Sequence, residues 1–101
     1  MEKQTSQLTG YIELLHKNMR VLVERYKVKS LGIFGSYVHG RQREKSDLDI
    51  LVEFFEPPGL LKFIEMEYYL SDLLGVKVDL VMKDALKPAI GSRILDEVIT
   101  I

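Results

Sequence analysis

The sequence has no cysteine and only two histidines, His16 and His39, among its 101 residues. Without cysteine, the chain can form neither a disulfide nor a thiolate zinc site. The two histidines are too isolated in the sequence to indicate a metal cluster. Disulfide-rich scaffolds and cysteine-based zinc proteins are therefore excluded.

Long apolar runs and an excess of charge are also missing. No stretch approaches the roughly 20 apolar residues of a membrane-spanning helix. No secretory signal precedes the first predicted helix, so we expect a cytoplasmic protein without membrane contact. Fourteen basic and fifteen acidic residues give a net charge of −1. This balance argues against strong nucleic-acid binding, which usually needs a basic face.

The chain has 47% hydrophobic residues and the length of one domain, which we assign to residues 1–101. A first helix is predicted to begin near Thr5 or Ser6 and to reach Tyr26. The other expected elements are a strand at 31–34, a short helix at 36–40, a charged loop at 41–46, a strand at 47–55, a helix at 60–74, a strand at 76–82 and a last helix from about Pro88. This alternation predicts an α/β domain with helices against one small mixed sheet.

Two features leave alternatives open. Tyr68-Tyr69 lies on the helix predicted at 60–74, where an aromatic pair is more often packing than an interface or an acceptor site. The ending Ile99-Thr100-Ile101 is apolar, and it indicates either an edge strand or a contact with a partner.

Two aspartates, Asp47 and Asp49, open the strand predicted at 47–55. Side chains alternate across a strand, so both carboxylates lie on one face, about 7 Å apart at Cα. Like charges this close repel, and a divalent cation relieves the repulsion. Mg²⁺ prefers one or two carboxylates together with phosphate oxygens. Two such ions about 4 Å apart can hold both oxygens of an in-line displacement at phosphorus.

Gly35-Ser36 precedes this pair by ten residues and directly follows an apolar run. Glycine permits a tight turn and a close backbone approach to a ligand. Ser36 is expected to cap the short helix that follows, with its N–H groups facing a phosphate. Arg41, Arg43 and Lys45 follow in a loop that is either a solvated segment or a phosphate clamp.

A third acid, Asp79, lies within the apolar strand predicted at 76–82. A charge in such a strand needs a partner or a metal. If this strand adjoins the Asp-x-Asp strand, three carboxylates meet. The alternative is a strand-end aspartate paired with Lys77 or Lys83.

Singly, these motifs are common in turns and strand ends. Together, the fixed spacing between two apolar strands and the third aspartate indicate transfer of a nucleotidyl group from a nucleoside triphosphate. In this interpretation Asp47, Asp49 and Asp79 are the catalytic and metal-binding residues, and Gly35 and Ser36 hold the triphosphate.

From about Tyr26 onward, the sequence resembles the nucleotidyltransferase superfamily of DNA polymerase β, and within it the minimal nucleotidyltransferases, or MNT proteins. The matching segments are Gly35-Ser36, Asp47-x-Asp49, Asp79, the stretch Ser46–Phe54, Ala85-Leu86-Lys87-Pro88 and Arg93-Ile94-Leu95. The resemblance implies a two-layer fold with helices mainly on one face of the sheet. His39 stands where the family often has arginine, which leaves Arg41 or Arg43 as the candidate for that phosphate contact.

The resemblance also implies a reaction and a partner. MNT proteins of this size commonly act as antitoxins beside a helical HEPN protein. The implied reaction transfers AMP from ATP to a tyrosine of that partner, with Mg²⁺ or Mn²⁺ as the metal. Asp79 would ligate metal and help to deprotonate the acceptor.

Two other functions stay open: an antitoxin that masks its partner without catalysis, and a transferase for a small-molecule hydroxyl. Little of the chain lies outside the predicted catalytic core. An active enzyme would therefore need an acceptor presented by a separate protein or by a second copy of the chain.

With a net charge of −1, the chain should bind duplex DNA or RNA no tighter than the non-specific range of about 10⁻⁴ to 10⁻⁶ M at physiological salt. A gel-shift titration measures this affinity. Nanomolar binding would overturn the expectation and favour a template-directed transferase.

Overall fold

A computed structural model describes residues 2–43 and 46–101 of the chain, with the side chains of the first helix described from Gln7 onward. The helices are α1 (Glu2–Tyr26), α2 (Ser36–His39), α3 (Leu60–Leu74), a 3₁₀ turn η1 (Lys83–Ala85) and α4 (Pro88–Glu97), and the strands are β1 (Val28–Phe34), β2 (Leu48–Phe54), β3 (Val78–Met82) and β4 (Ile99–Thr100). In this part of the chain, no helix has the length and apolarity needed to cross a membrane.

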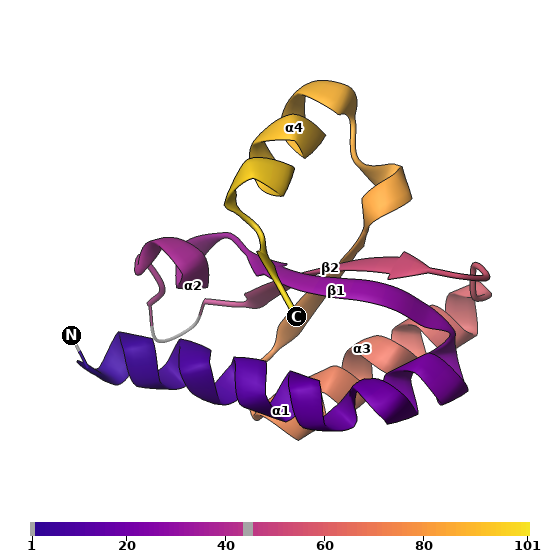
Figure 1. Ribbon diagram of the computed structural model, residues 1–101, viewed down its shortest axis with the longest axis horizontal. Helices are drawn as coiled ribbons and strands as arrows, with labels where there is room; N and C mark the ends of the chain where they lie inside the picture. Colours follow the sequence, from indigo (N-terminus) through magenta and orange to yellow (C-terminus); the bar gives the residue numbers. More distant parts are fainter. Residues whose placement is uncertain (1, 44–45) are drawn as a thin grey trace.

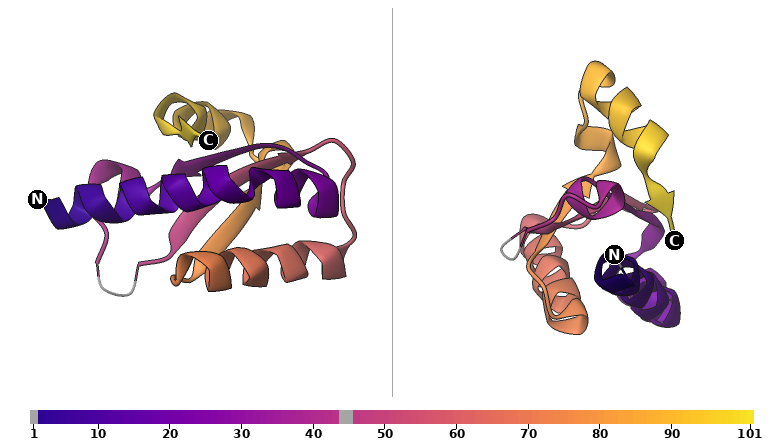
Figure 2. Two further views of the ribbon diagram at one scale, coloured as in Figure 1. Left: turned by 60° about the horizontal axis from the view of Figure 1, so that its bottom comes forward. Right: turned by 90° about the vertical axis from the view of Figure 1, so that its left-hand side faces the viewer.

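The four strands form one mixed sheet in the order β3-β2-β1-β4. β2 runs parallel to β3 and antiparallel to β1, and β4 runs antiparallel to β1. Helices α1 and α3 pack under one face of the sheet, and α4 lies on the other side (Figures 1 and 2). The expected α/β fold, with a small mixed sheet and helices mainly on one face, is confirmed.

The core lies between the sheet and the two long helices. Strand alternation places Leu48, Ile50 and Val52 on the core face of β2, where each is at most 1% exposed. They pack with apolar residues of α1, β1, α3 and β3, among them Leu15, Leu22, Tyr26, Val28, Ile33, Met66, Leu70 and Val78. The opposite face of β2 is left to carry the aspartates.

Helix α3 also protects the edge of the sheet at β3. The Leu80 N–H donates to Glu67 Oε2 at 2.8 Å, and the Val78 N–H donates to Ser71 Oγ at 3.0 Å. An edge strand otherwise presents unpaired backbone groups to other chains. Ser71 and Glu67 therefore accept from two backbone N–H groups of this edge strand and hold β3 against α3.

Several predicted boundaries were wrong. Helix α1 begins at Glu2, so Thr5 and Ser6 lie inside it, because the preceding Glu, Lys and Gln are themselves good helix formers. β1 begins at Val28 rather than at residue 31. The polar Ser30 interrupts the apolar run, but its hydroxyl donates to Glu53 of β2 at 3.2 Å and continues the strand pairing.

The C-terminal segment Ile99-Thr100-Ile101 and the pair Tyr68-Tyr69 lie as follows in the fold. Ile99 pairs with Ile33, so the C-terminal segment forms an edge strand beside β1. Tyr69 is partly buried, and its ring centroid lies 5.9 Å from that of Tyr26. Tyr68 differs from the expected packing, because it is 70% exposed.

Replacing the fully buried Leu70 with alanine should lower the free energy of unfolding by about 2–5 kcal/mol, because it leaves a cavity between α3 and the sheet. Urea denaturation measures the change. Leu61→Ala on the same helix is the matched control: Leu61 is 83% exposed, so the change should stay within about 0.5 kcal/mol. Equal losses in both variants would contradict this account of the core.

Candidate active site

The sequence motifs meet at one end of the sheet. Strand pairing places Asp49 opposite Phe34 of β1 on one side and opposite Asp79 of β3 on the other. Gly35 follows Phe34 directly, so the turn after β1 lies next to Asp49. The predicted adjacency of the two aspartate-bearing strands is therefore present in the fold.

The Asp49 carboxyl group has a clearly raised pKa and packs closely against Gly35. Burial, followed by the negative charges of Asp79 and Asp47, raises its pKa to about 6. On its other side, a Cβ atom added to Gly35 would collide with Asp49 Oδ2. Gly35 also has φ 84° and ψ −150°, a conformation that side chains rarely permit. Glycine is thus required at position 35 for two independent reasons.

Asp47 and Asp79 are more accessible than the core side chains. Asp47 Oδ2 lies 3.9 Å from Lys77 Nζ, in an exposed ion pair. Lys83 instead contacts Glu53, with Nζ 3.7 Å from Oε1. The ion pairs that these two lysines form are therefore with Asp47 and Glu53, and the alternative of a lysine-paired Asp79 finds no support in the structure.

The three carboxylates do not converge fully. Among the described residues, no group of three His, Cys, Asp or Glu side chains is arranged so that it could hold a metal ion. Asp49 and Asp79 are close enough for their side chains to share a hydrogen bond, whereas Asp47 faces Lys77. Metal binding by the three aspartates stays a prediction.

The turn after β1 differs from the expected capping arrangement. Gly35 occupies the N-cap position, and Ser36 is the first residue of α2. Ser36 was expected to cap this helix, but β1 runs into it so directly that the glycine conformation makes the turn. The Gly35 carbonyl accepts from the Val38 N–H at 3.1 Å. The Ser36 hydroxyl is therefore not used for capping.

Glu97, at the end of α4, contacts this turn although the sequence did not single it out. Its Oε2 accepts a hydrogen bond from the Gly35 N–H at 3.0 Å, and its Oε1 lies 2.8 Å from His39 Nε2. The bonds to His39 and Gly35 lower the pKa of Glu97. His39 thus contacts a carboxylate. In the sequence, the one hint of this contact was the histidine at position 39, where the resembled family often has arginine.

A cavity of about 230 Å³ opens beside the turn, lined by Phe34, Gly35, Ile90, Arg93, Ile94 and Glu97. Arg93 is the basic residue of this lining. Arg41 and Arg43 are exposed in the loop after α2 and do not contribute to the part of the lining that the structure describes. Lys45 lies outside the described residues.

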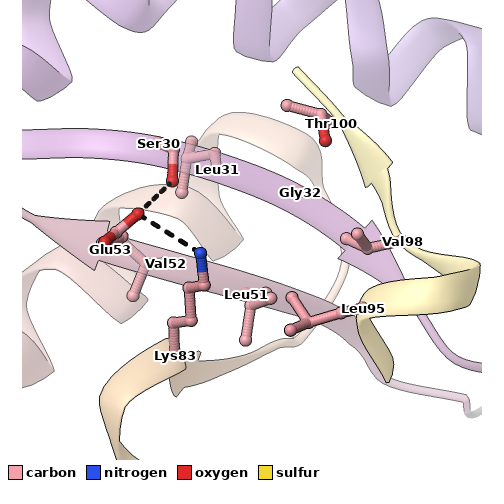
Figure 3. Close-up of a pocket in the computed structure, with 10 residues that line it drawn as sticks. All are labelled: Ser30, Leu31, Gly32, Leu51, Val52, Glu53, Lys83, Leu95, Val98 and Thr100. Atoms are coloured by element: carbon pink, nitrogen blue, oxygen red, sulfur yellow. Dashed lines mark hydrogen bonds and ion pairs between the residues drawn. The ribbon is translucent and has the colours of Figure 1, made fainter. Parts of the chain in front are cut away.

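A smaller cavity of about 70 Å³ lies between the sheet and α4, around Glu53 (Figure 3). Within this lining, Glu53 accepts from Ser30 and forms an ion pair with Lys83, and it forms a second ion pair with Lys29 outside the cavity. These contacts satisfy the carboxylate within the protein. The Gly35-Ser36 turn and the three aspartates lie at the other end of the sheet.

Residues 16–101 match the family model described as the nucleotidyltransferase domain. The chain belongs to this family and is a nucleotidyltransferase, as the motif spacing predicted. Within the family it is similar to protein adenylyltransferase MntA of Thermococcus cleftensis, at 54% identity over 86 residues, which cover 85% of this chain and 87% of that protein. It is 58% identical to a Methanocaldococcus jannaschii protein provisionally named a protein adenylyltransferase, over 86% of this chain and 90% of that protein.

Solved structures agree with this assignment. A structure titled as a minimal nucleotidyltransferase has a TM-score of 0.73 and 33% identity, and the match covers 95% of this chain and 93% of that one. A toxin–antitoxin structure with AMP-PNP has a TM-score of 0.66 and 26% identity, over 88% of this chain and 67% of that one. The prediction of a minimal nucleotidyltransferase fold is confirmed.

Asp49→Asn should raise the melting temperature of the metal-free protein at pH 8. The raised pKa means that the fold disfavours the ionised carboxylate, so wild-type stability falls between its ordinary pKa of 3.8 and about 6 and stays lower above that range. Allowing for solvent screening, we expect about 1 kcal/mol, or about 4–8 °C. Calorimetry in EDTA at pH 4 and pH 8 tests this.

Asp72→Asn, at an exposed position of α3, is the control and should change the melting temperature little at either pH. A lower melting temperature for Asp49→Asn at pH 8 would show instead that the Asp49 carboxylate supports the fold.

Proposed function

We propose that this chain transfers AMP from ATP to a hydroxyl group of a partner protein, and that the partner is a helical HEPN-type toxin. The observation that carries the proposal is the position of Asp49, between the Gly35 turn and Asp79. Relatives named protein adenylyltransferases support the reaction. The similarity to a solved toxin–antitoxin structure, together with the resemblance to MNT proteins, supports the partner.

The triphosphate is proposed to lie over the turn between β1 and α2. The Ser36 hydroxyl makes no capping hydrogen bond to α2, and the absence of a side chain at Gly35 lets the turn lie directly against Asp49. Arg93 lines the neighbouring cavity, so it joins Arg41 and Arg43 as a candidate for phosphate contact. The sequence did not show that Arg93 lies beside the Gly35 turn; the fold does.

The donor set fits a hard divalent cation. Asp47, Asp49 and Asp79 offer oxygen atoms alone. Burial, and then the negative charges of Asp79 and Asp47, raise the pKa of Asp49, so a bound cation would stabilise its ionised form. We propose that these three residues hold Mg²⁺, or Mn²⁺ in its place. When bound, the metal would neutralise negative charge on the carboxylates and the phosphates.

In the proposed transfer, the acceptor oxygen forms a bond to the α-phosphorus of ATP. The bond from this phosphorus to the bridging oxygen breaks, and pyrophosphate leaves with the electron pair. The acceptor proton passes to a carboxylate, for which Asp79 is placed best, because it is exposed on an edge strand and reachable from outside.

A protein acceptor suits the surface around the site better than a small diffusing alcohol. In-line attack needs the acceptor oxygen held about 3–3.5 Å from phosphorus. Asp79 is exposed, and so are most residues of α4 above the turn. A docked protein can supply the missing walls. We therefore propose residues 1–101 as one catalytic domain that is completed by its partner.

The test uses this chain, labelled ATP, Mg²⁺ and the helical protein encoded beside it. We expect the partner to gain about 329 Da for each AMP transferred to tyrosine, a mass that follows from the AMP formula and the transfer chemistry. Intact-mass spectrometry measures it. EDTA should abolish the gain, and Asp47→Asn should abolish it while complex formation persists.

Asp72→Asn is the control and should label like the wild type, because Asp72 lies on α3 outside the site. A partner that is neutralised with its mass unchanged would favour the masking function. If the partner neither binds nor gains mass, a small-molecule acceptor becomes the better hypothesis. Equal ATP affinity with and without EDTA would contradict the metal role.

A further inference from the structure

Glu97 connects two parts of the active-site turn through one carboxylate. Its two oxygens contact different groups, the Gly35 backbone N–H at 3.0 Å and His39 Nε2 at 2.8 Å. Gly35 precedes the first residue of α2, and His39 is the last residue of that helix. One side chain from a distant segment therefore holds both ends of the short helix that follows the turn.

The position of Glu97 follows from the pairing of β4. In this antiparallel pair, Ile99 lies opposite Ile33 and Thr100 lies opposite Gly32. Glu97 is the last residue of α4, two residues before Ile99, so this pairing brings it close to the end of β1 that leads into Gly35. A side chain at Gly32 would collide with Val98 Cγ2, so the glycine is what lets β4 approach β1 this closely.

Helix α4 has few other attachments near the turn. Most of its residues are exposed, including Ile90 at 55% and Leu95 at 46%, and its one buried residue is Gly91. Figure 2 shows α4 standing away from the sheet, with its last turn leading into β4. Glu97 therefore adds a direct hydrogen-bonded link between the end of α4 and the active-site turn.

The hydrogen bond to Glu97 restricts the backbone conformation of Gly35. Its φ of 84° and ψ of −150° form one of many conformations open to glycine, which loses more backbone freedom on folding than any other residue. A hydrogen bond to a charged acceptor is among the stronger ones, and it fixes the orientation of the peptide. The peptide that enters α2 is therefore oriented by Glu97.

The contact lies on the side of β1 that faces β4, whereas Asp49 lies on β2, at the opposite side. The Val38 N–H is already bonded to the Gly35 carbonyl, so the amides of Ser36 and Tyr37 come before the first intrahelical donor. Glu97 thus accepts from the Gly35 N–H that precedes these two amides, and its carboxylate shares the lining of the neighbouring cavity with Arg93.

We propose that Glu97 is a positioning residue for nucleotidyl transfer, clamping the Gly35 amide and the His39 imidazole so that the turn keeps the geometry that receives the triphosphate. This inference rests on the proposed function for its ligand. It also explains His39, which serves α2 through Glu97 and need not contact phosphate. Glu97 itself touches no reacting atom.

The test compares Glu97→Gln with Glu97→Ala in the full chain. Glutamine can accept from the Gly35 N–H and donate to His39, so Glu97→Gln should keep ATP affinity within about threefold of wild type. Glu97→Ala loses both bonds and should weaken ATP binding about 10- to 100-fold, with a matching rise in KM and a smaller change in kcat. Calorimetry with ATP and Mg²⁺ measures the affinity.

His39→Ala removes the second partner from an exposed position and provides a variant in case Glu97→Ala does not fold. It should weaken ATP binding less than Glu97→Ala, and the double variant should lose less than the sum of the two changes, because the residues act as a unit. Asp96→Ala is the matched control, an exposed carboxylate one residue away on α4, and should bind ATP like the wild type.

Unchanged ATP affinity in a folded Glu97→Ala protein would overturn the proposal. Tighter binding in either Glu97 variant would also overturn it, because Glu97 would then be an anion that nucleotide must displace. Loss in Glu97→Gln equal to that in Glu97→Ala would show that charge, and not positioning, matters. These readouts need no acceptor, so wild-type protein that binds ATP but labels no partner would count against the proposed reaction alone.

Discussion

The parallel pairing of β2 with β3 is the constraint on which the site depends, because it places Asp49 directly beside Asp79. Burial disfavours the ionised form of Asp49 most, and repulsion from Asp79 and Asp47 adds to the cost. The pairing persists because α3 connects the two strands and fastens the edge strand through Glu67 and Ser71. The fold thus concentrates negative charge at the site where we propose that a cation binds.

Strand alternation separates the core residues of β2 from Asp49, the residue of this strand that we propose to act in the reaction. Leu48 and Ile50 are fully buried against α1 and α3, and Asp49 lies between them on the opposite face. Burying each of these side chains contributes about 1.5–3 kcal/mol to the stability of the fold, which is enough to offset the cost of burying the Asp49 carboxylate. A rigid strand also holds Asp49 more firmly than a loop would. β2 therefore contributes both buried core residues and one of the three proposed metal ligands, Asp49.

The C-terminal segment completes the other half of the site. β4 has only two residues, yet its register against β1 brings Glu97 to the Gly35 turn. The same segment carries Arg93 to the cavity beside that turn. On the outer side, α4 leaves apolar side chains exposed, which suits a domain whose reaction is proposed to need a protein partner.

Local pattern was sufficient for the α/β class, for α3 at 60–74 and for the presence of β2 and β3, because periodicity and turn residues are properties of neighbouring residues. The spacing of Gly35 and Asp49 indicated the family for the same reason. The strand bounds were wrong: β2 begins at Leu48, so Asp47 precedes it, and β3 begins at Val78 rather than at residue 76. Tertiary structure alone decided the contacts of Glu97 with Gly35, the ion pair of Asp47 with Lys77, and the position of Arg93. These contacts join residues as many as 62 positions apart, and a two-residue strand has no periodicity from which its register could be predicted.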